Sequence, residues 1–194
     1  MKTFKQFFSE ANIVTGVDGV YFLRDGDGKL HRNFIMLNEP NTIVWTNNEG
    51  VIDRKDNPAI IKYFWDGKTR MQGWYKDGKR HREGDLPAYI TYNEDGTVHD
   101  RIWCLDGKET RVGKPANIMY YHSGKVAAEV YETDDRISRV GGPAVIHYKE
   151  DGTIKATRYY LHGNLMDKEE YDKHFEGVDP EHHNDFNDMN SGFN

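Results

Sequence analysis

The sequence repeats itself with a period of 28 or 29 residues, and this repeat limits what the chain can fold into more than any other feature. Pro-Ala pairs begin at Pro58, Pro87, Pro115 and Pro143, so successive pairs are 29, 28 and 28 residues apart. Each pair is followed at fixed offsets by an isoleucine, a tyrosine, a turn pair and a large aromatic residue. Units of this kind form an array in which each packs against its neighbours.

The offsets within a unit predict β-hairpins. The repeated isoleucines, tyrosines and large aromatics are Ile61, Ile90, Ile118, Ile146; Tyr63, Tyr92, Tyr120, Tyr148; and Trp74, Trp103, Tyr131, Tyr159. Alanine, isoleucine and tyrosine alternate with period two, so they share one face of a strand. An Asp-Gly or Ser-Gly pair then supplies the positive φ of a hairpin turn. We predict an all-β fold, an elongated antiparallel meander of about five hairpins over residues 11–166, with the first hairpin degenerate.

The opposite face of each first strand varies from unit to unit. The variable residues, together with one from a turn, are Tyr89, Thr91, Asn117, Met119, Tyr121, Val145 and His147. Exposed aromatic and methionine side chains on a flat sheet are typical of protein-binding surfaces. These seven residues are therefore the candidate protein-binding face, whereas the repeated aromatic residues are predicted to be structural.

Four arginines recur four or five residues before the prolines, namely Arg54, Arg82, Arg111 and Arg139. Such a row could bind phosphates, but the formal net charge is −6, and nucleic-acid binding needs a basic surface. We predict that each arginine stacks on an aromatic ring of the next hairpin. Nucleic acid is not an expected partner.

The sequence contains little that indicates catalysis. Cys104 is the only cysteine; it excludes an internal disulfide, favours a reducing compartment, and is predicted to be an ordinary sheet residue rather than a nucleophile. Residue types that ligate metals cluster at Asp179, Glu181, His182, His183 and Asp185. They lie in the acidic segment 176–194, which is predicted to be a disordered tail. No cofactor, metal or membrane partner is expected.

Both ends of the array carry helical patterns. Asp167 and Glu170 have the spacing of a capping box, which predicts a helix over residues 167–175 that covers the last hairpin. At the other end Phe4, Phe7 and Phe8 would share one face of a helix. The residue pattern by itself favours an N-terminal helix that docks on the first hairpin.

The units resemble the MORN type of hairpin repeat, and in particular a longer variant that reads "W-x-x-x-G-K-x-H-R-x-x-G-P-A". The segment "WYKDGKRHREGDLPA" carries the resemblance, which covers roughly residues 20–165. The period here is longer than the usual MORN unit, and the histidine of the "HR" pair is present only at His31 and His81. The membrane-lipid binding ascribed to some MORN arrays is therefore not carried over.

The first eleven residues, "MKTFKQFFSEA", resemble the capsid-targeting leader of internal head proteins in T-even-like tailed phages. In that family the leader directs the protein into the prohead, and a maturation protease cuts after the glutamate, here between Glu10 and Ala11. The resemblance implies that residues 1–10 are a leader and that the array is cargo ejected into the host. The prohead scaffold or the protease would bind the leader, and a host protein would bind the array.

The function expected from sequence is therefore a non-enzymatic protein-binding module, carried in the virion interior and then delivered to the host cytoplasm to inhibit a host defence or host enzyme. Two alternatives stay open. One is an enzyme of unknown type, injected or cytoplasmic, that uses Arg and His side chains across the sheet. The other is a structural component of the virion.

Overall fold

The computed structural model describes residues 12–15, 20–24, 30–36 and 41–176. The predicted leader, with its Glu10–Ala11 cleavage site, lies outside these residues. So does the predicted tail, apart from Glu176.

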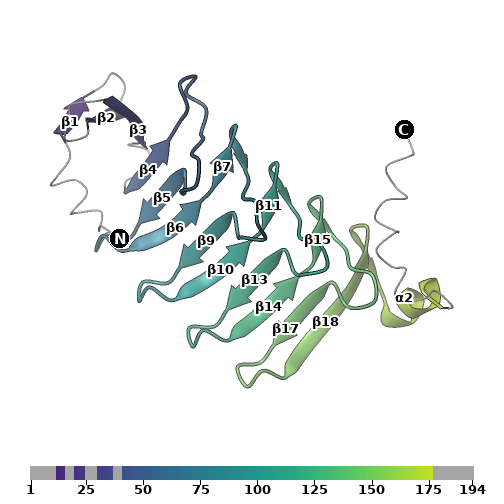
Figure 1. Cartoon of the computed structure of the whole chain (residues 1–194). Coiled ribbons are helices and arrows are strands. Elements are labelled where there is room, and N and C mark those ends of the chain that lie inside the picture. The colour runs from purple at the N-terminus through teal and green to yellow at the C-terminus, as the bar shows by residue number, and fades with distance from the viewer. Residues whose placement is uncertain (1–11, 16–19, 25–29, 37–40, 177–194) are drawn as a thin grey trace.

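The array is one antiparallel sheet in which each strand pairs with the next long strand along the chain (Figure 1). Its thirteen strands are β1 (Asn12–Thr15), β2 (Val20–Arg24), β3 (Leu30–Met36), β4 (Thr42–Trp45), β5 (Ile60–Tyr63), β6 (Thr69–Gly73), β9 (Tyr89–Tyr92), β10 (Val98–Ile102), β13 (Asn117–Tyr120), β14 (Val126–Val130), β17 (Val145–Tyr148), β18 (Ile154–Leu161) and β19 (Asn164–Met166). The predicted all-β hairpin meander is confirmed.

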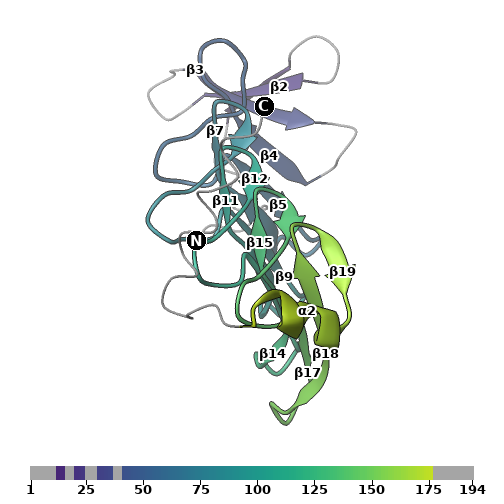
Figure 2. The same ribbon diagram turned by 90° about the vertical axis from the view of Figure 1, so that its right-hand side faces the viewer.

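The units that begin at Pro58, Pro87 and Pro115 each contain a second, shorter hairpin, which the offsets of the repeat do not separate from the first. These short hairpins are β7–β8 (Tyr75–Lys76 and Lys79–Arg80), β11–β12 (Cys104–Leu105 and Lys108–Glu109) and β15–β16 (Glu132–Thr133 and Arg136–Ile137). They stack on one another, because Gly107 N donates to Arg80 O and Asp135 N donates to Glu109 O. The short hairpins line one side of the long ones in both views (Figure 2).

The two kinds of turn use positive φ differently. In the long hairpin β5–β6 only Gly67 has positive φ (86°), while the Asp66 carboxylate accepts a hydrogen bond from Lys68 N. The predicted pair therefore does supply the positive φ of these turns, and it does so through its glycine alone. In the short hairpin β7–β8 both Asp77 (49°) and Gly78 (79°) have positive φ, as the two-residue type I′ turn requires.

The repeated face is held together by the tyrosines. Each tyrosine hydroxyl of the last three units bonds to a polar side chain on the second strand of the preceding hairpin. The pairs are Tyr92–Gln72 (2.8 Å), Tyr120–Arg101 (3.1 Å) and Tyr148–Glu129 (2.9 Å). The alanines after the prolines, Ala59, Ala88, Ala116 and Ala144, are all 0% exposed. These contacts link each unit to the one before it.

The predicted C-terminal helix is present as α2 (Lys168–His174), with the Asp167 side chain accepting from Glu170 N. The ring of Tyr171 lies 4.9 Å from the ring of Tyr159, the last repeated aromatic. In the other units an arginine follows this aromatic by eight or nine residues, whereas Asp167 stands eight residues after Tyr159. The helix therefore covers the ring that no arginine covers.

Candidate binding surfaces

Each of the four recurring arginines forms the same clamp. Its guanidinium stacks on the large aromatic that precedes it by eight or nine residues: Arg54 on Trp45 at 4.0 Å, and Arg82 on Trp74, Arg111 on Trp103 and Arg139 on Tyr131, each at 3.8 Å. Its Nη1 donates to the carbonyl of the following proline, over 3.1, 3.0, 3.3 and 3.2 Å in the same order. Stacking is confirmed as a structural contact of the array.

The predicted partner ring was wrong. We expected the next hairpin, but each arginine returns to the ring of its own unit because the short hairpin reverses the chain between them. In the second unit, for example, His81 N donates to Trp74 O and closes that hairpin.

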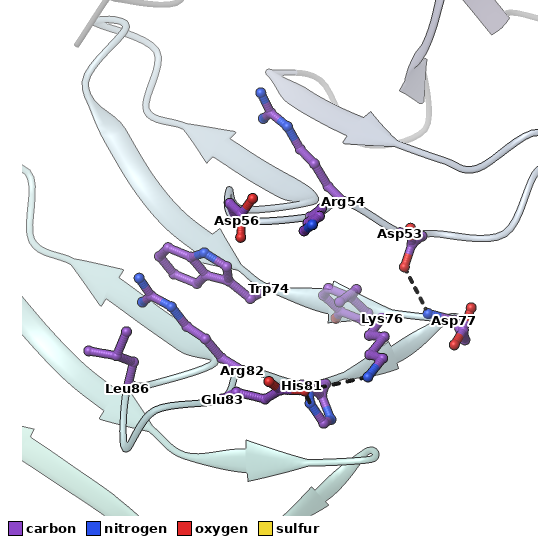
Figure 3. A pocket seen from close by; sticks show the side chains of 12 residues that line it. Asp53, Arg54, Asp56, Trp74, Lys76, Asp77, His81, Arg82, Glu83 and Leu86 are labelled. Atoms are coloured by element: carbon purple, nitrogen blue, oxygen red, sulfur yellow. Dashed lines mark hydrogen bonds and ion pairs between the residues drawn. The ribbon is translucent and has the colours of Figure 1, made fainter.

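Adjacent clamps leave a cleft between them. The Trp74 cleft has a volume of about 590 Å³ and lies between the loop that follows Arg54 and the loop that follows Arg82. Asp56, Trp74 and Leu86 are among its lining residues (Figure 3). One unit further on, the Trp103 cleft of about 520 Å³ lies between the loops that follow Arg82 and Arg111.

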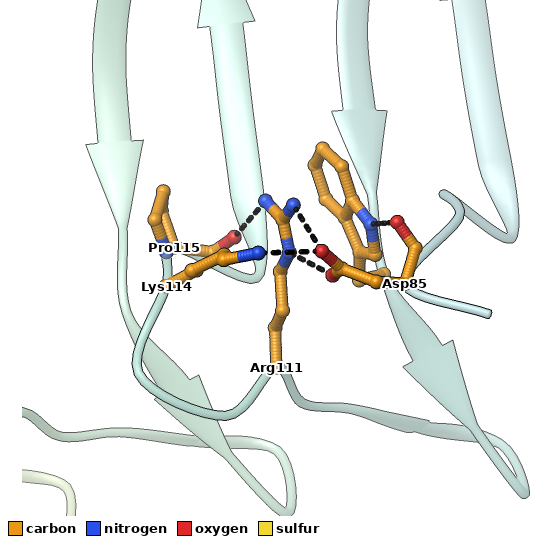
Figure 4. A network of polar contacts seen from close by, with 5 residues as sticks. Asp85, Arg111, Lys114 and Pro115 are labelled. Carbon is orange, nitrogen blue, oxygen red and sulfur yellow. Dashed lines mark hydrogen bonds and ion pairs between the residues drawn. The ribbon is translucent and has the colours of Figure 1, made fainter. Parts of the chain in front are cut away.

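An aspartate from the preceding loop binds the clamp of the Trp103 cleft (Figure 4). The carboxylate of Asp85 accepts from Arg111 Nε at 2.6 Å and Nη2 at 3.2 Å, and from Lys114 Nζ at 2.7 Å. These donors hold the pKa of the Asp85 carboxyl well below its usual range. The backbone carbonyl of Asp85 also accepts from Trp103 Nε1 at 3.1 Å.

The register of the sheet brings the predicted protein-binding residues of different units together. Thr91 lies opposite Asp100, Asp100 opposite Met119, and Met119 opposite Ala128, which in turn pairs with His147. Met119 is 38% exposed, and the Thr91 hydroxyl donates to the Asp100 carboxylate. We call the row from Thr91 to His147 the variable row.

A second row runs beside it, nearer the short hairpins, and includes Tyr89, Asn117 and Val145. Val145 is only 8% exposed, and the guanidinium carbon of Arg80, on a short hairpin, lies 5.9 Å from the centre of the Tyr89 ring. Tyr121 lies apart at a hairpin end, where its hydroxyl donates to Tyr148 O. Val145 therefore offers a partner less surface than Met119 of the variable row does.

A third cleft, of about 560 Å³, joins the variable row to the ends of two long hairpins. Tyr89 and Thr91 line it, as do His99 and His122. The two histidines were not among the predicted site residues, because they lie at a bulge and a turn, where the offsets of the repeat do not assign a face.

Several strongly exposed apolar side chains also lie outside the predicted face. They include Trp65 (86% exposed), Val112 (88%), Leu86 (47%) and Leu105 (44%). Trp65 is at a hairpin tip, and Leu86 and Val112 are in the loops between clamps. For Trp65 and Leu86 the sequence contains a usable signal, because each is an apolar residue at a turn or loop position that is polar or small in the other units.

The two remaining side chains that could take part in a reaction, Cys104 and Glu132, lie on strands of the short hairpins. Cys104 is 1% exposed, and burial raises the pKa of its thiol to about 11. A nucleophile needs an accessible thiolate, so this environment fits the structural role predicted for Cys104. Burial, followed by contact with the Glu109 carboxyl, raises the pKa of Glu132 to about 7. Within the described residues no group of three or more metal-ligating side chains has the geometry to hold a metal ion.

Comparison with known proteins adds little. No family model and no curated protein matches the sequence. Two solved structures of TarM are similar, one of them a variant of S. aureus TarM in complex with fondaparinux, alpha-GlcNAc-glycerol and UDP. Both are 12% identical to this chain, with TM-scores of 0.21 and 0.20; the matches cover 86% and 81% of this chain but 24% of each TarM chain. A likeness this low supports no conclusion about fold or function. Among the helices described here, none is long and apolar enough to cross a membrane.

Proposed function

We propose that this chain is a non-enzymatic protein-binding repeat module whose partner lies against the variable row. The observation that carries the proposal is the register, which lines up non-repeated side chains from successive hairpins, among them Thr91, Met119 and His147. The repeated face is occupied by contacts between units, such as the Tyr92–Gln72 bond. A surface that differs from unit to unit on a regular scaffold is suited to recognition of one extended partner.

The more specific proposal is that the module is an internal head protein of a phage, delivered with the DNA to inhibit a host defence or a host enzyme. The resemblance of residues 1–11 to a capsid-targeting leader supports it. On this account the leader is bound by the prohead scaffold and the maturation protease, and the array acts afterwards on a host protein in the cytoplasm.

Site-specific photo-cross-linking tests the binding surface. A photoreactive amino acid at position 119 should give one discrete protein adduct in host extract, and His147→Glu should reduce its yield. The same amino acid at Glu169, on the far end of the array in α2, is the matched control and should give none. Equal adducts from both positions, or no effect of His147→Glu, would contradict the proposal.

A further inference from the structure

The Trp74 and Trp103 clefts contain the same clamp of an arginine on an aromatic ring, but a side chain of the chain itself binds the clamp in only one of them. In the Trp103 cleft a single residue, Asp85, satisfies both partners of the clamp: its carbonyl accepts from Trp103 Nε1, and its carboxylate accepts from Nε and Nη2 of Arg111. This edge of the guanidinium is suited to a carboxylate, which it binds with two parallel hydrogen bonds.

In the Trp74 cleft the same donors lack these partners. Trp74 is 8% exposed, and its Nε1 makes no hydrogen bond within the described part of the chain. Arg82 stacks on Trp74 at 3.8 Å and donates from Nη1 to Pro87 O, as its counterpart Arg111 does to Pro115 O. Among described residues, nothing accepts from Nε or Nη2 of Arg82. The indole nitrogen of Trp74 is buried, and an unpaired buried donor is costly, so such donors usually have partners.

Loop length explains the difference. Asp85 lies in the segment from Arg82 to Pro87, "REGDLP", in which Gly84 (78°) and Asp85 (54°) both have positive φ. The corresponding segment from Arg54 to Pro58, "RKDNP", is one residue shorter, and only Asp56 (63°) has positive φ. Asp56 lines the Trp74 cleft but makes no hydrogen bond to Arg82. In Figure 3 it lies beyond the indole nitrogen of Trp74, on the side away from Arg82.

We propose that the Trp74 cleft binds an acidic residue from an extended segment of a partner protein. Its carboxylate takes the place of the Asp85 carboxylate on Nε and Nη2 of Arg82, and a backbone carbonyl accepts from Trp74 Nε1. Lys55 is a further cation in the lining of the cleft. Leu86, 47% exposed on the same lining, provides an apolar contact for a neighbouring side chain. The inference rests on the proposed protein-binding function and names the chemistry of the partner.

The probe that tests it copies the residue that fills the neighbouring cleft. The peptide acetyl-Gly-Asp-Leu-Pro-amide, with the sequence of residues 84–87, is titrated into ¹⁵N-labelled full-length protein. The indole N–H resonances are followed and assigned with Trp74→Phe and Trp103→Phe. The Trp74 resonance should shift and saturate, while the Trp103 resonance, already bonded to Asp85 O, should stay in place.

Three further titrations identify the source of the carboxylate. The peptide with Asn in place of Asp should bind at least about tenfold more weakly, as the loss of a charge-assisted pair predicts. Sodium acetate should compete with the peptide only at much higher concentration, and inorganic phosphate should not reproduce the Trp74 shift. Equal binding of the Asp and Asn peptides, or an equal response to phosphate, would overturn the proposal.

Two variants test the geometry in the full chain. Arg82→Lys keeps the charge and loses the two-donor edge, so peptide binding should fall by about tenfold or more. A glycine inserted after Lys55 lengthens the loop to "RKGDNP"; the internal aspartate should then reach Arg82, shift the Trp74 resonance without peptide and block the peptide. Asp56→Asn should leave peptide binding unchanged or tighter.

Loss of binding in Asp56→Asn would show that Asp56, not Arg82, holds the peptide, and would overturn the proposal. Peptide binding that survives both Arg82→Lys and the insertion would do the same. Failure here would leave the cross-linking result at position 119 unaffected, because the cleft lies between the loops and not on the variable row.

Discussion

At the scale of single residues, the array depends on aromatic rings that lie between two successive loops and are contacted by a group from each of them. Trp103 shows the full set of contacts: Arg111 stacks on the ring at 3.8 Å, Asp85 O accepts from its indole nitrogen, and the side chain is 7% exposed. A ring held in this way joins two successive loops.

Truncation of the Trp103 side chain measures how much this ring contributes to the free energy of unfolding. Trp103→Ala should lower the free energy of unfolding by about 3 to 5 kcal/mol, as a large-to-small change in a packed site, measured by urea denaturation. Trp65→Ala is the matched control, since Trp65 is 86% exposed and its removal should change stability by less than about 0.5 kcal/mol. Equal effects of the two substitutions would show that the ring does not join the units.

Glu132 makes stability depend on pH. Its pKa is raised to about 7 by burial and by the adjacent Glu109, so the folded state binds this proton more tightly than the unfolded chain does. The resulting stabilisation is full below about pH 4.5 and is lost as the pH rises to about 7. Glu132→Gln should therefore stabilise the protein at pH 8 by about 1 to 2 kcal/mol, allowing for partial exposure of the carboxyl, and have little effect at pH 4.5. Glu150→Gln, at an exposed turn, should leave the free energy of unfolding unchanged at both pH values. A gain in stability at pH 8 as large as that of Glu132→Gln would contradict the assignment of the pH dependence to Glu132.

At the scale of elements, the long hairpins follow from the sequence and the short ones do not. Period-two alternation from Ala88 to Tyr92 and the turn glycine Gly96 predict β9 and β10 directly. The strands of β7–β8 are two residues long, too short for any alternation to be read. The second Asp-Gly pair, Asp77-Gly78, marks the turn, but only the bonds between stacked short hairpins show that these residues form a layer.

Which side chains fill the clefts between the clamps could not be predicted from the sequence either, again because the short hairpins were not visible in it. The arginines and aromatics are visible as repeats, but their pairing depends on the reversal of the chain in the short hairpin. Asp85 reaches Arg111 because its loop is one residue longer than the others, and the sequence shows this only as one spacing of five residues between arginine and proline among spacings of four. The choice of Thr91, Met119 and His147, by contrast, followed from alternation along their strands, whereas their alignment in one row required the register of the sheet.

The helix α2 is the element that ends the array. Tyr171 is 3% exposed; its hydroxyl donates to Arg139 O at 2.5 Å and accepts from Gly142 N at 3.1 Å. Its ring covers Tyr159, so the helix takes the place of a further unit.

Removing this contact should loosen the last hairpin first. Tyr171→Ala should cost about 3 to 5 kcal/mol, and Tyr171→Phe, which deletes only the hydroxyl, about 1 to 3 kcal/mol because two backbone groups lose a partner. Hydrogen exchange should rise most in β17 and β18. The exposed Glu169→Ala in the same helix is the control; if exchange in β17 and β18 is as slow in Tyr171→Ala as in this control, α2 does not act as a cap.

At the scale of the whole molecule, the sheet extends along one axis, and among the described residues each long strand pairs with the next along the chain. Stability is then a sum over units and interfaces, and segments outside the array should contribute little to it. Removal of residues 177–194, which are acidic and contain no Lys or Arg, should leave the melting temperature within about 1 °C of that of the full chain. A clear drop would show that these residues pack against the array.

The N-terminal residue of the protein in purified particles tests the functional account most directly. If residues 1–10 are a targeting leader, chains made in infected cells begin at Met1, and chains inside the virion begin at Ala11, with the mass difference of the ten-residue leader seen by intact mass spectrometry. Their removal should hardly change the melting temperature of the array. Full-length chain alone in the particles, or no chain in them at all, would contradict the account of an injected cargo.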